Sequence, residues 1–188
     1  MTTIHLGFAT LAVLVALALL FDFMNGFHDA ANSIATIVST GVLKPYQAVV
    51  WAAFFNVVAL FFFELRVAAT VGKGIVDPVV VDHVVIFGAL CGALAWNIIT
   101  WIFGIPSSSS HALIGGLIGA TLAKAGTESL LLAGIMKVAL FILISPLLGF
   151  VLGSALMLAV SWIFFRSTPR GTDRWFRRLQ LLSSALYS

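Results

Sequence analysis

Asp22–Ser33 reads DFMNGFHDAANS and lies between two apolar runs of the chain. Its carboxylates and amides recur at intervals of three, four and three residues, which places them on one face of a helix. Polar groups at membrane depth are costly, so we expect this face to line a cavity, a neighbouring helix or a cargo. Because Gly26 weakens a helix, we also expect an unwound or bent section at Asn25–Asp29. The residues of the polar face are Asp22, Asn25, Asp29 and Asn32.

The composition indicates an integral membrane protein. Of the 188 residues, 61% are hydrophobic and 9% are charged, and the mean hydropathy is +1.13. In soluble domains about a quarter of the residues are charged, so we expect most of this chain to lie in a lipid bilayer. The net charge of +3 is concentrated near the C-terminus, which argues against a nucleic-acid-binding face. The single cysteine, Cys91, cannot form an internal disulfide.

Long apolar runs predict membrane-spanning helices, because about 20 residues at 1.5 Å each cross a hydrocarbon core of about 30 Å. The predicted spans are Ile4–Phe23, Tyr46–Leu65 and His83–Phe103. Ala112–Ala123 is too short to cross, so it predicts a half-helix that forms a broken or re-entrant hairpin with the span before it. Ser129–Phe165 is either one long kinked helix or a tight pair of helices. The predicted fold class is all-α, with polytopic transmembrane helices and half-helices.

The C-terminal part of the chain is basic. An excess of Lys and Arg beside a span marks the cytoplasmic side, so we predict a cytoplasmic tail. The predicted domains are a transmembrane domain, residues 1–166, and a basic tail, residues 167–188, in which a new apolar segment begins at Leu181–Ser188. The arginines that follow the last apolar run are Arg166, Arg170, Arg174, Arg177 and Arg178.

A second polar stretch, Gly104–His111, reads GIPSSSSH and precedes the predicted half-helix. Its serines present hydroxyl and backbone N–H groups together, and we expect the half-helix to begin near Ser110. The first N–H groups of a helix have no partner within it, and the helix dipole adds partial positive charge there. Such a helix start binds phosphate, sulfate or carboxylate. The alternative is that the serines only cap and pack the helix. The candidate anion-binding serines are Ser107, Ser108, Ser109 and Ser110.

The first polar stretch offers ligands for a cation. Asp29, Asn32 and Asn25 supply oxygen atoms for Na⁺, or Asp29 supplies a protonatable carboxylate for coupling to H⁺. The amides of Asn25 and Asn32 are also candidates to bind phosphate, because an Asn amide donates to a phosphate oxygen. A carboxylate repels a phosphate dianion unless a cation or a proton lies between them, so we expect the cation and the anion to bind together, as in symport. The alternative is a hydrogen-bonded cluster that only holds helices together.

Three further residues have alternative roles. Asp22 supports the cation site or lies at the membrane interface. His28 carries a proton, because histidine titrates near physiological pH, or it donates to the substrate. His111 donates to an anion or holds the loop. We expect no cofactor other than the coupling ion, and no structural metal site.

Both polar stretches resemble signatures of the inorganic phosphate transporter (PiT) family. Asn25–Ser33 resembles the first signature, whose core reads N-D-x-A-N, and Gly104–His111 resembles the family's G-x-P-x-S-[ST]-[ST]-H element. The resemblance extends over essentially the whole chain, and the presence of both elements in order makes it specific. It implies an all-α, inverted-repeat transporter that holds phosphate between two halves and is driven by Na⁺ or H⁺.

The resemblance also implies roles for single residues. Asp29 and Asn32 match the acid and the amide of the first element. Ser108–Ser110 match the hydroxyl run of the second element, and His111 matches its closing histidine. At position 28 the chain has His where Asn is commoner in the family. In this it is similar to the bacterial low-affinity branch of H⁺-coupled carriers, whose cargo is phosphate or a neutral metal–phosphate complex.

The chain has one copy of each element where the family has two, so we expect it to be an N-terminal half that does not complete a two-sided site alone. We predict a phosphate symporter of the bacterial inner membrane, completed by a second half-repeat or another copy of the chain. The alternatives are a transporter of sulfate or another oxyanion, and a non-transporting half-size membrane subunit. A membrane hydrolase is disfavoured, because Ser110 and His111 point in different directions from a helix start and no acid orients the histidine. We expect neither enzymatic activity nor a nucleic-acid partner.

Overall fold

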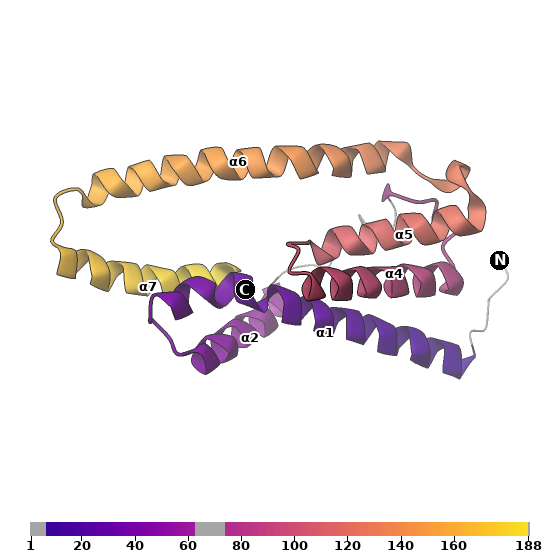
Figure 1. The fold of residues 1–188 in the computed structure, drawn as a ribbon, viewed down its shortest axis with the longest axis horizontal. Helices are drawn as coiled ribbons and strands as arrows, with labels where there is room; N and C mark the ends of the chain where they lie inside the picture. Colours follow the sequence, from indigo (N-terminus) through magenta and orange to yellow (C-terminus); the bar gives the residue numbers. More distant parts are fainter. Residues whose placement is uncertain (1–6, 63–73, 188) are drawn as a thin grey trace. The chain divides into compact units, whose positions relative to one another are not determined.

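The computed structural model describes residues 7–62 and 74–187, so the first residues of the first predicted span and the last residues of the second lie outside the described part. Figure 1 shows that this part is built from α-helices, which confirms the predicted fold class. Within residues 7–62 and 74–187 the only β-structure is an isolated bridge between Val76 and Leu130. The helices are α1 (Phe8–Ser39), α2 (Pro45–Phe62), α4 (His83–Ile102), α5 (Ser109–Ala125), α6 (Leu132–Phe164) and α7 (Pro169–Tyr187), with a 3₁₀ turn η1 (Thr127–Ser129).

The described residues form two compact units. The first contains residues 7–28 and 74–136, and the second contains residues 29–62 and 137–187. Helix α1 contributes to both, because the boundary falls between His28 and Asp29. The predicted division at residue 166 separates a transmembrane domain from a tail, which is a different kind of division from these two compact units. It stays a prediction.

Helix α1 runs without interruption from Phe8 to Ser39, so the expectation of an unwound section at Asn25–Asp29 was wrong. A glycine inside a helix costs about 1 kcal/mol relative to alanine, and a single Gly26 does not outweigh the helical turns on either side. In lipid the backbone has no water to bond, which further favours an unbroken helix.

Helices α4 and α5 form the predicted hairpin. The carboxylate of Asp82 caps α4 by accepting the N–H groups of Val84 and Val85, at 3.1 Å each. The chain turns at Gly104, whose φ of 63° suits glycine. Helix α5 starts before the predicted half-helix, and its 17 residues still fall short of the about 20 that a span needs.

A small residue allows the two helices of the hairpin to approach closely. A Cβ added to Gly116 of α5 would collide with the carbonyl oxygen of Ala89 in α4, whereas one added to Gly119 would meet nothing within 4 Å. Close approach at small residues is a common way for membrane helices to associate. The first part of α1 packs onto this hairpin through an apolar cluster of Phe21, Leu90, Ala93, Leu94 and Ala112.

The apolar stretch that began at Ser129 forms one long helix, α6, rather than a tight pair, and its residues up to Met136 belong to the first unit. Pro146 lies inside it, and such a proline removes one backbone hydrogen bond and costs about 3 kcal/mol or more. The hydroxyl of Ser145 donates to the carbonyl of Phe141 at 2.8 Å, so a side chain bonds the backbone beside the proline.

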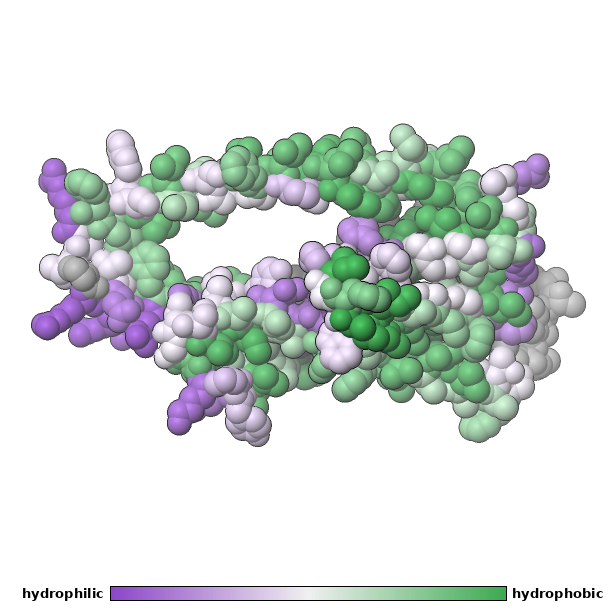
Figure 2. Space-filling model, viewed as in Figure 1, coloured by the Kyte–Doolittle hydropathy of each residue, from purple (hydrophilic) through white to green (hydrophobic). Residues whose placement is uncertain are grey.

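The surface of the helices fits a bilayer. Three described helices, α1, α4 and α6, are long and apolar enough to cross a membrane, and Pro45–Ala59 of α2 is a shorter apolar segment. No residue of α6 is buried, and Figure 2 shows apolar residues along much of its length. Large apolar surfaces of this kind mark membrane contact, so the chain is a membrane protein.

Candidate functional site

The serine stretch forms the start of helix α5. Ser108 is the N-cap residue, and its hydroxyl accepts the N–H of His111 at 3.5 Å, a long hydrogen bond. The carbonyl of Ser108 accepts the N–H of Ala112 at 3.0 Å, which begins the helical ladder. The helix therefore begins at Ser109, one residue before the predicted start. Ser110 lies in the first turn and is exposed, at the end where N–H groups and the helix dipole favour an anion.

The two polar stretches meet within the first unit. The hydroxyl of Ser109, which is 8% exposed, donates to the side-chain oxygen of Asn25 in α1. In the same unit, Phe27 of α1 packs edge-on against Trp101 of α4, with ring centroids 5.5 Å apart. The hydrogen bond joins residues 84 positions apart, so it positions the start of α5 against the polar face of α1.

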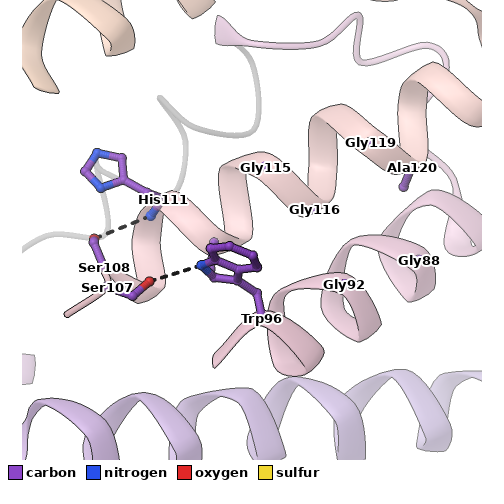
Figure 3. Close-up of a pocket in the computed structure, with 11 residues that line it drawn as sticks. Gly88, Gly92, Trp96, Ser107, Ser108, His111, Gly115, Gly116, Gly119 and Ala120 are labelled. Carbon is purple, nitrogen blue, oxygen red and sulfur yellow. Dashed lines mark hydrogen bonds between the residues drawn. The ribbon is translucent and has the colours of Figure 1, made fainter. Parts of the chain in front are cut away.

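A groove of about 520 Å³ follows the hairpin from the serines toward its glycines (Figure 3). At its polar end, the indole N–H of Trp96 donates to the hydroxyl of Ser107 at 3.1 Å. Ser108 and His111 also line the groove, and the imidazole of His111 points away from Trp96. Three of the predicted anion-binding residues therefore share one groove. The rest of its lining consists of Gly88, Gly92, Ala112, Gly115, Gly116, Gly119 and Ala120.

Two buried nitrogen atoms of the first unit have no hydrogen-bond partner among the described residues: Nε2 of His28 and Nδ2 of Asn97. Asn97 is 2% exposed. Leaving a buried polar group unpaired costs about 1–3 kcal/mol. His28 was predicted as a site residue. For Asn97, the only signal in the sequence was an amide within an apolar span. Nothing in the sequence indicated the hydrogen bond of Trp96.

The predicted cation ligands lie further along α1, in the second unit. Asn32 donates to the carboxylate of Asp29 at 3.4 Å, and Asn32 is exposed whereas Asp29 is partly buried. Asp22 belongs to the first unit and is exposed. Asp22, Asp29 and Asn32 share a face of α1 with Asn25 by their spacing along the helix. Among the residues that the structure describes, no group of three or more His, Cys, Asp or Glu side chains is arranged to hold a metal ion.

An ion pair joins the other end of the hairpin. The ammonium group of Lys124, in the last turn of α5, lies 2.7 Å from a carboxylate oxygen of Asp82 and donates to the carbonyl of Val80 at 3.1 Å. The hydrogen bond from Lys124 lowers the pKa of Asp82 from 3.8 to about 2, and the bond from the N–H of Val85 acts in the same direction. This pair holds the ends of α4 and α5 together, away from the serines.

Comparisons with known proteins show which family this chain is similar to. Residues 25–188 match the phosphate transporter family. The chain is 61% identical over 183 residues to a probable low-affinity inorganic phosphate transporter of Rhizobium meliloti, covering 97% of this chain and 55% of that protein. It is 47% identical over 180 residues to a protein of the same description from Streptomyces halstedii, covering 94% of this chain and 83% of that protein.

A solved structure, the sodium-dependent phosphate transporter, is similar with a TM-score of 0.79 and 27% identity, over 87% of this chain and 42% of that one. The chain spans about half the length of its relatives from Rhizobium meliloti, at 55%, and Bacillus subtilis, at 53%. The family match covers most of the residues, including Asn25–Ser33 and Gly104–His111. The chain therefore belongs to the phosphate transporter family, a family of membrane transporters and not of enzymes.

Proposed function

We propose that this protein carries inorganic phosphate across a membrane and that this chain supplies one half of the phosphate site. Family membership and the description of its relatives as low-affinity inorganic phosphate transporters support this proposal. A second repeat or another copy of the chain supplies the other half. The arginines after α6 favour a cytoplasmic C-terminal tail, in a bacterial inner membrane.

The observation that carries the proposal is the hydrogen bond between Ser109 and Asn25. It brings the start of α5, with its hydroxyl and N–H donors, to the amide of Asn25 in α1. Phosphate oxygens accept hydrogen bonds from both kinds of group. In the proposed site, Ser107–Ser110 and His111 contact phosphate from α5, and Asn25 and His28 contact it from α1.

The coupling ion is proposed to bind at Asp29 and Asn32, with Asp22 on the same face of α1. Two unit charges of the same sign 4 Å apart repel by about 4 kcal/mol at an effective dielectric constant near 20. That repulsion would weaken phosphate binding about a thousandfold, since 1.4 kcal/mol corresponds to a factor of ten. Na⁺ at Asp29, or a proton on it, removes this repulsion and so couples the two substrates.

Uptake of radiolabelled phosphate in a bacterial host without its own phosphate transporters tests the proposal. Ser109→Ala should lower uptake by about two- to tenfold, because one hydrogen bond contributes about 0.5–1.5 kcal/mol. Ser145→Ala is the matched control: this serine donates to the carbonyl of Phe141 in α6, outside the site, so uptake should not change. Equal uptake by the wild type and the Ser109→Ala variant would refute the site.

The same assay separates the alternatives. A protonophore abolishes H⁺-coupled uptake, whereas removal of Na⁺ abolishes Na⁺-coupled uptake, and excess sulfate competes only if the site accepts other oxyanions. Uptake that requires co-expression of a second repeat supports a site made of two halves. A protein that transports no phosphate in either arrangement is not a phosphate carrier.

A further inference from the structure

The buried amide of Asn97 in α4 has no role in the site described above. Asn97 is 2% exposed, and its Nδ2 has no hydrogen-bond partner among the residues that the structure describes. The next buried polar residue of α4 does not pair with it, because the hydroxyl of Thr100 donates to the backbone carbonyls of Trp96 at 2.9 Å and of Asn97 at 3.1 Å. Buried polar groups are almost always paired, so an unpaired amide in an apolar span calls for an explanation.

Helices α1 and α4 carry amides at corresponding levels. Phe21 of α1 and Ala93 of α4 belong to one apolar cluster. Further along both helices, Phe27 packs against Trp101. The two helices therefore run in the same direction past each other (Figure 1). A residue four positions beyond the cluster lies on the same face of its helix, one turn further along. The residues at these positions are Asn25 in α1 and Asn97 in α4.

Helix α5 brings a third polar residue to this level from the opposite direction. Ala112 belongs to the same apolar cluster. Ser109 lies three residues before it, on the same face of α5 and one turn nearer to the start of the helix. The hydroxyl of Ser109 donates to Oδ1 of Asn25. The unpaired amide of Asn97 therefore lies at the level of this hydrogen bond, on the third of the helices that pack together there.

We propose that Asn97 is a positioning residue of the phosphate site, and that its amide replaces Ser109 as the donor to Asn25 when phosphate binds. This inference rests on the proposed function. A serine hydroxyl has a single proton, so Ser109 cannot donate to Asn25 and to a phosphate oxygen at once. When this hydroxyl donates to phosphate, Oδ1 of Asn25 loses its donor. Nδ2 of Asn97 then donates to Oδ1, which holds the amide of Asn25 in place beside the phosphate.

The exchange links phosphate binding to the pairing of a buried group. Nδ2 of Asn97 gains a partner only in the phosphate-bound site, so its pairing favours binding. In the described conformation the same unpaired group lowers the stability of the fold. Loss of the amide should therefore weaken phosphate binding and raise stability. An amide with a purely structural role would behave differently, because its loss would lower stability.

Asn97→Leu tests the exchange, because leucine has nearly the same shape and no donor. In the uptake assay the KM for phosphate should rise by about two- to tenfold with kcat unchanged. The melting temperature of the purified protein should rise by about 2–12 °C, because an unpaired buried group has been removed. Asn97→Gln keeps a donor and should restore much of the KM. The matched control is Asn56→Leu, which removes an exposed amide from α2 and should leave the KM unchanged.

The same substitution in an Asn25→Ala background separates the exchange from direct contact between Asn97 and phosphate. The acceptor is then absent, so Asn97→Leu should add no further rise in KM. An equal rise in both backgrounds would overturn the proposal. A lowered melting temperature, or an unchanged KM in a protein that takes up phosphate, would also overturn it. Absence of phosphate uptake by the wild type would overturn the proposed function, and this inference with it.

Discussion

Replacement of Gly116 by alanine tests whether the hairpin depends on close helix contact. The added Cβ would lie against the backbone carbonyl of Ala89. Backbone atoms cannot move aside as the end of a flexible side chain can, so α4 and α5 must separate to accept the methyl group. Because α5 carries Ser109 at its start, this separation should also weaken the bond between Ser109 and Asn25.

The expected size of the effect follows from overpacking. An extra methyl group in a well-packed contact costs about 1–3 kcal/mol, and in a protein of this length each kcal/mol lowers the melting temperature by about 2–4 °C. Gly116→Ala should therefore lower the melting temperature by about 2–12 °C. The matched substitution Gly119→Ala adds a methyl group with nothing within 4 Å, and it should stabilise α5 by up to about 1 kcal/mol through helix propensity.

Thermal unfolding of the purified protein in detergent measures both variants. The predicted result is opposite signs for the two glycines, together with reduced phosphate uptake for Gly116→Ala alone. If both variants melt at the same temperature, close contact at Gly116 does not hold the hairpin together, and the reasoning fails.

Two further predictions concern the ends of the hairpin. Trp96→Phe removes the donor to Ser107 and should raise the KM for phosphate uptake up to about tenfold. The control Trp101→Phe keeps an aromatic contact and should leave the KM unchanged. Equal KM values for the wild type and Trp96→Phe would contradict the role of Trp96. The bond from Lys124 depresses the pKa of Asp82 to about 2. The ion pair should therefore stabilise the fold fully above the ordinary pKa of aspartate near 4, and this stabilisation should disappear as the pH falls toward 2. Carboxyl NMR titration should show Lys124→Met raising this pKa; an unchanged pKa would contradict the ion pair.

Much of the fold could be predicted because its signals are local. The interval of three or four residues places Asn25 and Asp29 on one helical face whatever the rest of the chain does. The run of serines after Pro106 predicts a helix start, and α5 begins within one residue of the expected position. Neither prediction required knowledge of distant contacts.

The remaining features depend on contacts that a sequence pattern does not record. The bond between Ser109 and Asn25 joins residues far apart in the chain, and the bond between Trp96 and Ser107 depends on how the turn at Gly104 is made. Local rules also overestimated the effect of Gly26 on α1, because one residue of low helix propensity does not interrupt a long helix. For α6, one kinked helix and two short ones have the same hydropathy, so the sequence left both open.

The most direct test of the central claim is a double-mutant cycle at Asn25 and Ser109, measured as kcat/KM for phosphate uptake. If the two side chains act as one hydrogen-bonded unit that contacts phosphate, Asn25→Ala and Ser109→Ala should each lower kcat/KM about tenfold, and the double variant should also lose about tenfold. A loss near 100-fold in the double variant would show independent action. Unchanged uptake in either single variant would contradict the proposed site.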